Sequence, residues 1–236
     1  MIKITVITVC FNCKNDIEST ILSVINQTYP NIEYIVIDGG STDGTIEIIE
    51  KYHDKIHTFV SEADQGIYDA MNKGLKYTSG TMVNFMNAGD KFYNNDTLSL
   101  VFSSNSSWDE YALIYGNTYR VQRKFITKPL DLSALKSGII MACHQSIFYN
   151  KDIIGDSLYY KHSRGIYADY DLTSRIINSN LKTKYIDLTI SSFLGNGTTT
   201  NRNLKNRYYR YKNAFHNYGI MGVINAILFR INKYIN

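Results

Sequence analysis

The first ninety residues alternate short apolar strands with helical segments, and this order limits the possible folds more than any other feature of the chain. Four stretches have strand character, and apolar residues at helical spacing follow each of the first three: "IKITVITV", "EYIVID", "KIHTFV" and "TMVNFM". Strands joined through helices lie parallel in one sheet, with right-handed crossovers. The pattern therefore predicts an α/β fold with a Rossmann-like, mostly parallel sheet and flanking helices.

From about residue 111 onward the pattern becomes mixed. The elements expected there are antiparallel strands at "YALIYG", "TYRVQR" and "HQSIFY", a helix over 168–178, and two short strands over 183–187 and 189–194. The last 36 residues have mainly helical character. The sequence therefore predicts a first half over 1–95, a mixed second half over 96–200, and a helical tail over 201–236.

The composition agrees with one large α/β domain that carries a small appendage. The chain has 236 residues, of which 44% are hydrophobic, and only two prolines. No secretory signal is visible, and no apolar run approaches the roughly 18 residues of a membrane span. Three cysteines do not make a disulfide framework. These features favour a cytoplasmic protein.

The positive charge of the chain is concentrated in its tail. The net charge is +4, with 25 basic and 21 acidic residues in total. Residues 201–236 contain no acid and seven of the bases: Arg202, Lys205, Arg207, Arg210, Lys212, Arg230 and Lys233. The first 200 residues are therefore slightly acidic, and the tail alone makes the protein basic.

Cys10 and Cys13 form a C-x-x-C between a predicted strand and a predicted helix, as in thioredoxin-like redox proteins. The alternative is a pair of small buried residues at the end of a strand. No second C-x-x-C is present to complete a zinc site, and the βαβα order that follows differs from a short redox domain. The structural interpretation is favoured.

Three acids follow predicted strands of the first half: Asp38, Asp64 and Asp90. Each alone is typical of a turn or a helix cap, but the carboxyl ends of parallel strands meet at one edge, where such sheets bind ligands. No Gly-rich phosphate loop follows any strand. If the cleft binds a phosphorylated ligand, a divalent cation held by a carboxylate is the remaining way to neutralise it. Asp90 is placed for that role.

Polar residues of the second half supply further candidates. His144 and Gln145 precede a predicted strand, where a polar pair is unusual for a core, so either a structural or an acceptor-side role remains open. Asp169 and Asp171 lie in the first turn of the predicted helix, where acids favour the macrodipole without any further role. Asp169 could instead act as a general base if this helix faces the cleft.

Several ordered motifs resemble those of the family-2 glycosyltransferases, which have the GT-A fold. The resemblance covers roughly residues 2–195 and is carried by four stretches: "ITVCFNCKNDIESTILSVINQTYPNIEYIVIDGGSTDGT", "SEADQGIYDAMNKGLKYTSGTMVNFMNAGD", "CHQSIFY" and "ADYDLTSRI". It is strongest to bacterial enzymes of capsule, colanic-acid-type and other surface polysaccharides.

The resemblance also implies a role for each matching position. On the donor side, it implies that Thr8, Phe11 and Asp38 bind the base and ribose and that Asp64 and Lys73 line the nucleotide pocket. It places the metal motif at Asn87 to Asp90. The acid of the family's "Glu-Asp" motif, the acceptor base, falls on Asp169. This chain departs from the pattern at Asn87, Gly89 and Ala168, where many members have acids. Asp90 is then the single carboxylate left for the metal.

The implied activity is an inverting, metal-dependent glycosyl transfer. A UDP- or GDP-linked sugar would be the donor, Mn²⁺ or Mg²⁺ the cofactor, and a hydroxyl of a glycan or lipid-linked glycan the acceptor. No nucleic-acid partner is expected. Two alternatives are a non-catalytic nucleotide-sugar or glycan-binding relative and a nucleotidyltransferase, whose Gly-rich, lysine-bearing amino-terminal signature is absent.

The tail, residues 201–236, combines basic, aromatic and apolar residues. One interpretation is a helix that packs on the domain or on a second copy in a homodimer. The other is an interfacial segment that lies on an anionic membrane without crossing it, on the inner face of the cell membrane.

Overall fold

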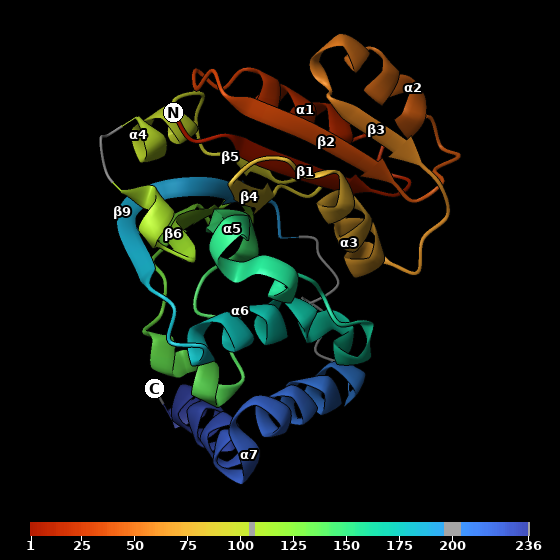
Figure 1. Cartoon of the computed structure of the whole chain (residues 1–236). Helices are drawn as coiled ribbons and strands as arrows, with labels where there is room; N and C mark the ends of the chain where they lie inside the picture. The colour runs from red at the N-terminus through yellow and green to blue at the C-terminus, as the bar shows by residue number, and fades with distance from the viewer. Residues whose placement is uncertain (104–106, 196–203, 236) are drawn as a thin grey trace.

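One nine-stranded sheet runs through the computed structural model, which describes residues 1–103, 107–195 and 204–235 (Figure 1). The strand order is β3-β2-β1-β4-β8-β6-β9-β5, and β7 pairs with β6. The strands are β1 (Ile4–Cys10), β2 (Ile32–Asp38), β3 (Thr58–Ser61), β4 (Met82–Phe85), β5 (Lys91–Phe92), β6 (Leu113–Arg120), β7 (Phe125–Thr127), β8 (Ile147–Asn150) and β9 (Thr183–Phe193). Because β5 pairs with β9, the sheet does not divide near residue 95.

The first half has the predicted parallel arrangement. β1 pairs in parallel with β2 and β4, and β2 pairs in parallel with β3. The register sets Cys10 beside Asp38 and Asp38 beside Ser61, so these strands end at one common edge. The α/β prediction is confirmed, and the loops after β1, β2 and β4 converge as parallel strand ends must.

The second half differs from the expected elements in two places. "YALIYG" and "TYRVQR" contribute to one strand, β6, and the two short strands expected over 183–194 are one long strand, β9. The register between β6 and β9 shifts around Asn117, beside Gly116. A Cβ atom on Gly116 would lie 2.6 Å from the Leu188 carbonyl oxygen, so glycine permits this close approach. The irregularity interrupts the two-residue periodicity, which made one strand look like two.

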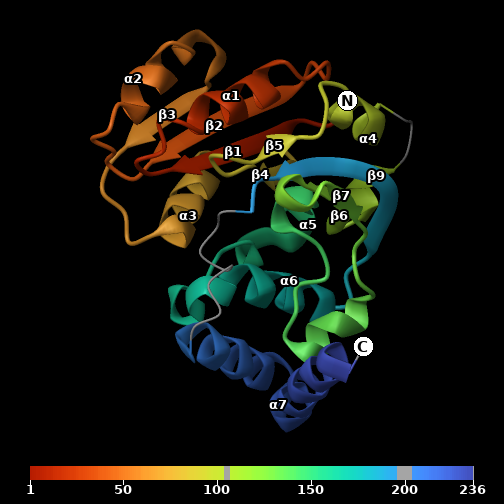
Figure 2. The same ribbon diagram turned by 180° about the vertical axis from the view of Figure 1, so that it is seen from behind.

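Helices cover both faces of the sheet (Figures 1 and 2). The helices are α1 (Ile17–Ile25), α2 (Thr45–Glu50), α3 (Ile67–Tyr77), α4 (Thr97–Phe102), α5 (Lys151–Ile154), α6 (Ala168–Asn178) and α7 (Leu204–Ile235). Residues of α1, α2 and α4 join one hydrophobic core cluster, and residues of α3, α5 and α6 join the other. The sheet thus lies between two apolar layers, and its loops at the carboxyl edge stay accessible.

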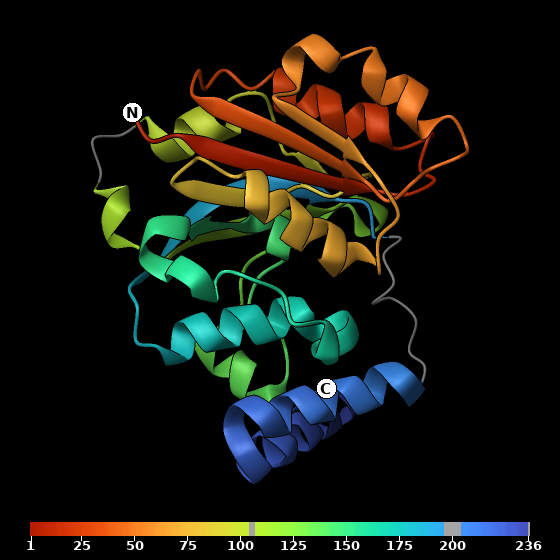
Figure 3. The ribbon, with the colours of Figure 1, turned by 45° about the vertical axis from the view of Figure 1, so that its right-hand side comes forward.

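The tail forms α7, which is bent at Gly219, where φ is +62°. It contacts two 3₁₀ segments, Leu132–Ser137 and His162–Tyr167, and forms a layer beyond α6, away from the sheet (Figure 3). The predicted helical character of the tail is confirmed. Within the described ranges, no helix has the length and apolar character needed to cross a membrane.

Candidate active site

An exposed aromatic ring and a carboxylate flank the backbone at the carboxyl end of β2. A Cβ atom on Gly39 would lie 2.6 Å from Asp64 Oδ2 and 3.3 Å from the Phe11 ring. The Phe11 side chain is 60% exposed, although a phenyl ring is normally buried. The structure therefore brings the predicted residues Phe11 and Asp64 together on either side of Gly39, where any larger side chain would displace Asp64. An exposed ring beside a carboxylate offers a stacking surface and a hydrogen-bond acceptor to a flat polar ring.

Asp38 lies beneath this surface and is fully buried. Its Oδ2 accepts hydrogen bonds from the Gly40 N–H at 3.0 Å, the Ser41 N–H at 2.8 Å and the Ser61 hydroxyl at 2.7 Å. Burial disfavours its charge, but the bonds from Ser41, Ser61 and Gly40 outweigh that cost and hold the pKa of Asp38 below its usual range. Asp38 is therefore an ionised anchor that fixes the turn below Phe11.

Two other residues predicted for the donor pocket have partners within the fold. Thr8 is fully buried in β1, and its hydroxyl donates to the Met86 carbonyl at 2.8 Å. Lys73 Nζ donates to the Ala63 carbonyl at 2.8 Å and pairs with Glu62 at 2.9 Å. Thr8 thus lies inside the sheet rather than at its edge. Lys73 ties the loop that carries Asp64 to α3.

Asp90 occupies a buried position in the loop that follows β4, where its side chain is 5% exposed. Its Oδ1 accepts from the Leu194 N–H at 3.0 Å, and its Oδ2 accepts from the Gln145 side-chain amide. Burial raises the pKa of Asp90 to about 6, against the hydrogen bonds from Leu194 and Gln145, which favour the charged form. Each oxygen keeps lone-pair capacity, so a cation would find an acceptor here and would favour the ionised carboxylate.

Asn87 and His144 lie next to each other at this loop, with Asn87 Nδ2 3.2 Å from His144 Nε2. Asn87 Oδ1 and His144 Nδ1 are both buried, and neither has a hydrogen-bond partner among the described residues. Burial lowers the pKa of His144 to about 4, so its imidazole is neutral at pH 7. Buried polar atoms without partners are rare, and an unpaired amide oxygen near a carboxylate suits a hard cation.

These positions test whether the chain could hold a divalent ion. The described residues contain no cluster of three or more His, Cys, Asp or Glu side chains able to bind a metal. Asp90 and Asn87 nevertheless supply oxygen atoms of the kind that Mg²⁺ and Mn²⁺ take, and such ions commonly keep waters and substrate phosphates as further ligands. The residues therefore fit a cation that a bound diphosphate would share. His144 and Gln145, which are predicted to lie on the acceptor side, contact Asn87 and Asp90 of this loop.

Asp169 begins the first turn of α6, in agreement with the helix predicted over 168–178. It is half-buried, and its Oδ1 accepts from the Tyr170 N–H at 2.7 Å. Burial raises the pKa of Asp169 to about 6, although the Tyr170 N–H and the nearby Tyr68 hydroxyl favour its charged form. A carboxylate with a pKa near 6 is ionised at pH 7 yet basic enough to accept a proton in a transition state.

Asp171, two positions further along α6, has a different environment. It is fully buried, with Oδ1 3.0 Å from Arg164 Nε and Oδ2 2.9 Å from Arg175 Nε. Asn217 of α7 also donates to Oδ1, at 3.4 Å. Asp171 thus joins α6 to the segment before it and to the tail, which is a structural role.

The half-buried thiol of Cys143 lies within electrostatic reach of both candidate carboxylates. Burial raises the pKa of Cys143 to about 12; the Arg120 charge opposes this rise, and the charges of Asp90 and Asp169 add to it. Asp90 comes from the first half and Asp169 from the second, so the fold brings the two ends of the predicted chemistry to one region. The thiol itself stays protonated and is a poor nucleophile.

Sequence reasoning missed three contributors to this region: the Leu194 N–H, Tyr68 and Arg120. A backbone amide leaves no trace in a sequence, and Tyr68 reaches Asp169 across about a hundred residues of chain. Arg120 ends β6 opposite Phe193, over whose ring its guanidinium lies at 4.8 Å. The one feature of the sequence that could have indicated Arg120 was its position at the end of a predicted strand.

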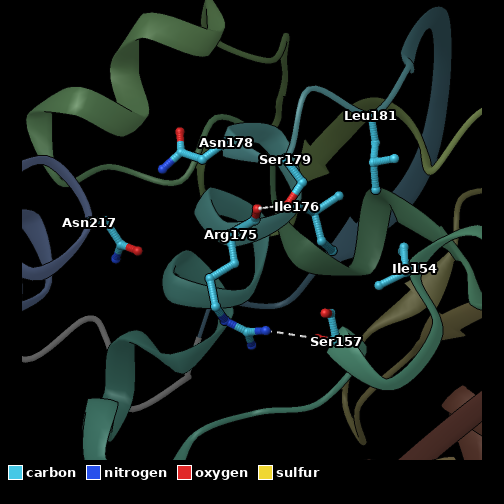
Figure 4. Close-up of a pocket in the computed structure, with 8 residues that line it drawn as sticks. All are labelled: Ile154, Ser157, Arg175, Ile176, Asn178, Ser179, Leu181 and Asn217. Atoms are coloured by element: carbon cyan, nitrogen blue, oxygen red, sulfur yellow. Dashed lines mark hydrogen bonds between the residues drawn. The ribbon is translucent and has the colours of Figure 1, made fainter.

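A pocket of about 310 Å³ lies elsewhere, between the carboxyl-terminal part of α6, α5 and α7 (Figure 4). Arg175 is the charged group in its lining, and its guanidinium is already bonded to Asp171 and to the carbonyls of Ser157 and Tyr159. The pocket lies six to ten positions along α6 from Asp169. It is therefore separate from the carboxylate site.

The fold is that of the GT-A class of glycosyltransferases. The structure of S. aureus TarS 1–349 in complex with UDP matches 91% of this chain and 65% of that chain, with a TM-score of 0.71 and 18% identity. The mannosyltransferase PcManGT from Pyrobaculum calidifontis, solved with GDP-Man and Mn²⁺, matches 96% of this chain and 73% of that chain, with a TM-score of 0.70 and 16% identity. At such identities these likenesses establish the fold alone.

The sequence identifies the family. The chain belongs to glycosyl transferase family 2, whose profile matches residues 5–165. A PGL/p-HBAD biosynthesis glycosyltransferase of Mycobacterium bovis is 32% identical over 178 residues, which cover 72% of this chain and 68% of the relative. A putative teichuronic acid biosynthesis glycosyltransferase of Bacillus subtilis, TuaG, is 37% identical over 92 residues, 38% of this chain and 36% of the relative.

Proposed function

We propose that this glycosyltransferase is an inverting, metal-dependent enzyme that transfers a sugar from a UDP- or GDP-linked donor to a hydroxyl of a surface-polysaccharide acceptor. The observation that carries the proposal is that Asp90 and Asp169 both lie within electrostatic reach of the Cys143 thiol. Asp90 is buried and Asp169 half-buried, they come from opposite halves of the chain, and burial raises the pKa of each carboxyl. Two structurally similar proteins were solved with UDP and with GDP-Man and Mn²⁺, which supports a nucleotide-sugar donor.

The residues divide the work between nucleotide and sugar. Phe11 and Asp64 would receive the nucleoside over Gly39, and Asp38 holds the turn that positions them. Asp90, with Asn87 beside it, would hold Mn²⁺ or Mg²⁺. The bound cation would stabilise the charge of the departing diphosphate as a Lewis acid.

Asp169 acts on the acceptor. As the acceptor oxygen forms its bond to the anomeric carbon, the bond from that carbon to the donor phosphate breaks, and the acceptor proton passes to the Asp169 carboxylate. One displacement inverts the anomeric centre and needs no covalent nucleophile. The raised pKa of Asp169 matches this role, because a base with a pKa near the working pH is the most effective.

We extend the proposal to a lipid-linked acceptor at the inner face of the cell membrane. A family-2 relative is a PGL/p-HBAD biosynthesis glycosyltransferase, and the basic tail of this chain suits an anionic surface. A non-catalytic sugar-nucleotide-binding relative is the alternative from another class. The presence of both Asp90 and Asp169 counts against this non-catalytic alternative.

Donor binding is expected to raise the melting temperature of the protein in the presence of Mn²⁺. A ligand at a hundredfold excess over its Kd stabilises the native state by about 2.7 kcal/mol, or about 5–10 °C for a chain of this size. A panel of UDP- and GDP-linked sugars tested by thermal shift identifies the donor. The same panel with EDTA in place of Mn²⁺ is the control. If no nucleotide sugar shifts the melting temperature, the proposal fails.

A further inference from the structure

The part of α7 beyond Gly219 presents its apolar side to solvent. Six residues repeat at helical spacing on one face and are between 40% and 69% exposed: Ile220, Met221, Ile224, Ile227, Leu228 and Ile231. The opposite face carries the small residues Gly222 and Ala226, both buried. A surface helix normally buries its apolar stripe and exposes its polar one. This helix instead exposes its apolar stripe, so the stripe needs a partner.

The part of α7 before Gly219 fixes this face relative to the catalytic half. Asn213 is fully buried and donates to the Arg164 carbonyl at 3.1 Å, and Asn217 donates to Asp171 Oδ1 at 3.4 Å. Tyr209 packs against Gly165, where a Cβ atom would lie within 3 Å of the ring. These contacts join α7 to α6, whose first turn carries Asp169, and to the segment that precedes α6. Whatever covers the apolar face therefore also orients the acceptor side of the enzyme.

The exposed side chains of the first part of α7 are aromatic, aliphatic and basic. Tyr208 and Phe215 are more than half exposed, and Arg207 and Lys212 are exposed as well. Lys212 Nζ lies 5.7 Å from the centre of the Tyr208 ring. Aromatic and basic side chains, in a segment that also carries an apolar stripe, are the composition of helices that lie in the headgroup region of a bilayer.

The charge of the tail distinguishes between the two partners that an apolar face can have. Residues 201–236 contain seven basic residues and no acidic ones. A second copy would bring a second tail of the same net positive charge, whereas an anionic surface attracts a tail of this charge. We infer that the apolar face of α7, from Ile220 to Ile231, inserts into the headgroup region of an anionic membrane and holds the enzyme on its surface. The inference rests on the proposed function only for the lipid-linked acceptor.

Vesicle binding without donor or acceptor tests this inference independently of glycosyl transfer. The full-length protein should sediment with vesicles of phosphatidylglycerol and phosphatidylcholine at low salt, and much less with phosphatidylcholine alone or at high salt. Combining Ile224→Glu with Leu228→Glu should lower the bound fraction about tenfold or more. The matched control combines Leu22→Glu with Leu100→Glu, which adds the same charge at exposed apolar positions outside the tail. It should sediment as the unmodified protein does.

Three results would overturn the inference. The first is no sedimentation with anionic vesicles at low salt, and the second is equal sedimentation with neutral ones. The third is a dimer, measured by light scattering, that ignores vesicles and becomes monomeric when Ile224 and Leu228 are replaced; a second copy would then cover the face. Melting temperatures of all variants verify that each is folded. Because donor-induced thermal shifts are measured separately, either proposal can fail alone.

Discussion

Replacing Asp169 with asparagine should abolish sugar transfer, lowering kcat by about 10²–10⁴-fold, while donor affinity stays nearly unchanged. Asparagine keeps the shape of the side chain and still accepts from the Tyr170 N–H, so α6 should begin as before. What it loses is the ability to take the acceptor proton. Steady-state kinetics with saturating donor give kcat, and the donor-induced thermal shift gives the affinity.

The matched control is Asp171→Asn in the same turn of α6. Asp171 is fully buried between Arg164 and Arg175, so its loss leaves two largely buried guanidinium groups without their ion-pair partner and should cost about 3–5 kcal/mol of folding stability. At temperatures where this variant is folded, its turnover should stay far above that of Asp169→Asn. Equal loss of turnover in both folded variants would contradict the assignment of Asp169 alone as the general base.

The pH profile adds a readout that a structural role of Asp169 would not produce. Because burial raises the pKa of Asp169 to about 6, the carboxylate becomes protonated and inactive as a base below that pH. With donor and Mn²⁺ saturating, kcat should fall about tenfold per unit below pH 6. The residual rate of Asp169→Asn should lack this limb.

Replacing Asp90 with asparagine should lower turnover on the order of 10³-fold and remove the Mn²⁺-dependent thermal shift by donor, because a Lewis-acid contribution is worth several kcal/mol. The unliganded protein should keep its melting temperature or gain a little. Burial raises the pKa of Asp90 from 3.8 to about 6, so its ionised form destabilises the fold at pH 7 by up to about 2–3 kcal/mol, and asparagine removes that charge. Lost binding with preserved stability is the signature of a ligand-binding residue.

Asp16→Asn serves as the control for Asp90. Asp16 is exposed and close to the loop, since its Cβ lies 3.7 Å from where a Cβ of Gly89 would be, and its charge contributes to the raised pKa of Asp90. Its removal changes the local field without removing a candidate metal ligand. Full turnover and unchanged Mn²⁺ dependence in Asp90→Asn would make Asp90 a turn residue only.

The sequence predicted the fold where local pattern and global topology agree. Strand–helix alternation predicted the parallel half, and the helix predicted over 168–178 is α6. The pattern failed at β9, where the register shift opposite Asn117 broke the two-residue periodicity. A register shift of this kind depends on the neighbouring strand, so it cannot be predicted from the sequence of one strand alone.

The candidate site was predictable in outline, because acids after parallel strands must meet at one edge. Burial was not. Thr8 lies on a central strand whose two faces are both covered, so its side chain is buried although it is polar. His144 and Gln145 could be located only once β8 was known to lie beside β4, which carries them to the Asn87–Asp90 loop. Long-range antiparallel pairing is set by the whole sheet, and no local signal specifies it.

The central claim is that the chain breaks the bond between a donor sugar and its nucleoside diphosphate and forms an inverted glycosidic bond. The most direct measurement is analysis of the products formed from the donor identified by thermal shift, with Mn²⁺ and a glycan acceptor. The account predicts free nucleoside diphosphate, released in equal amount to a glycoside whose anomeric configuration is opposite to that of the donor sugar. Release of pyrophosphate would indicate nucleotidyl transfer, an intact donor would indicate a binding module, and a retained configuration would exclude the single displacement; each result would contradict the account.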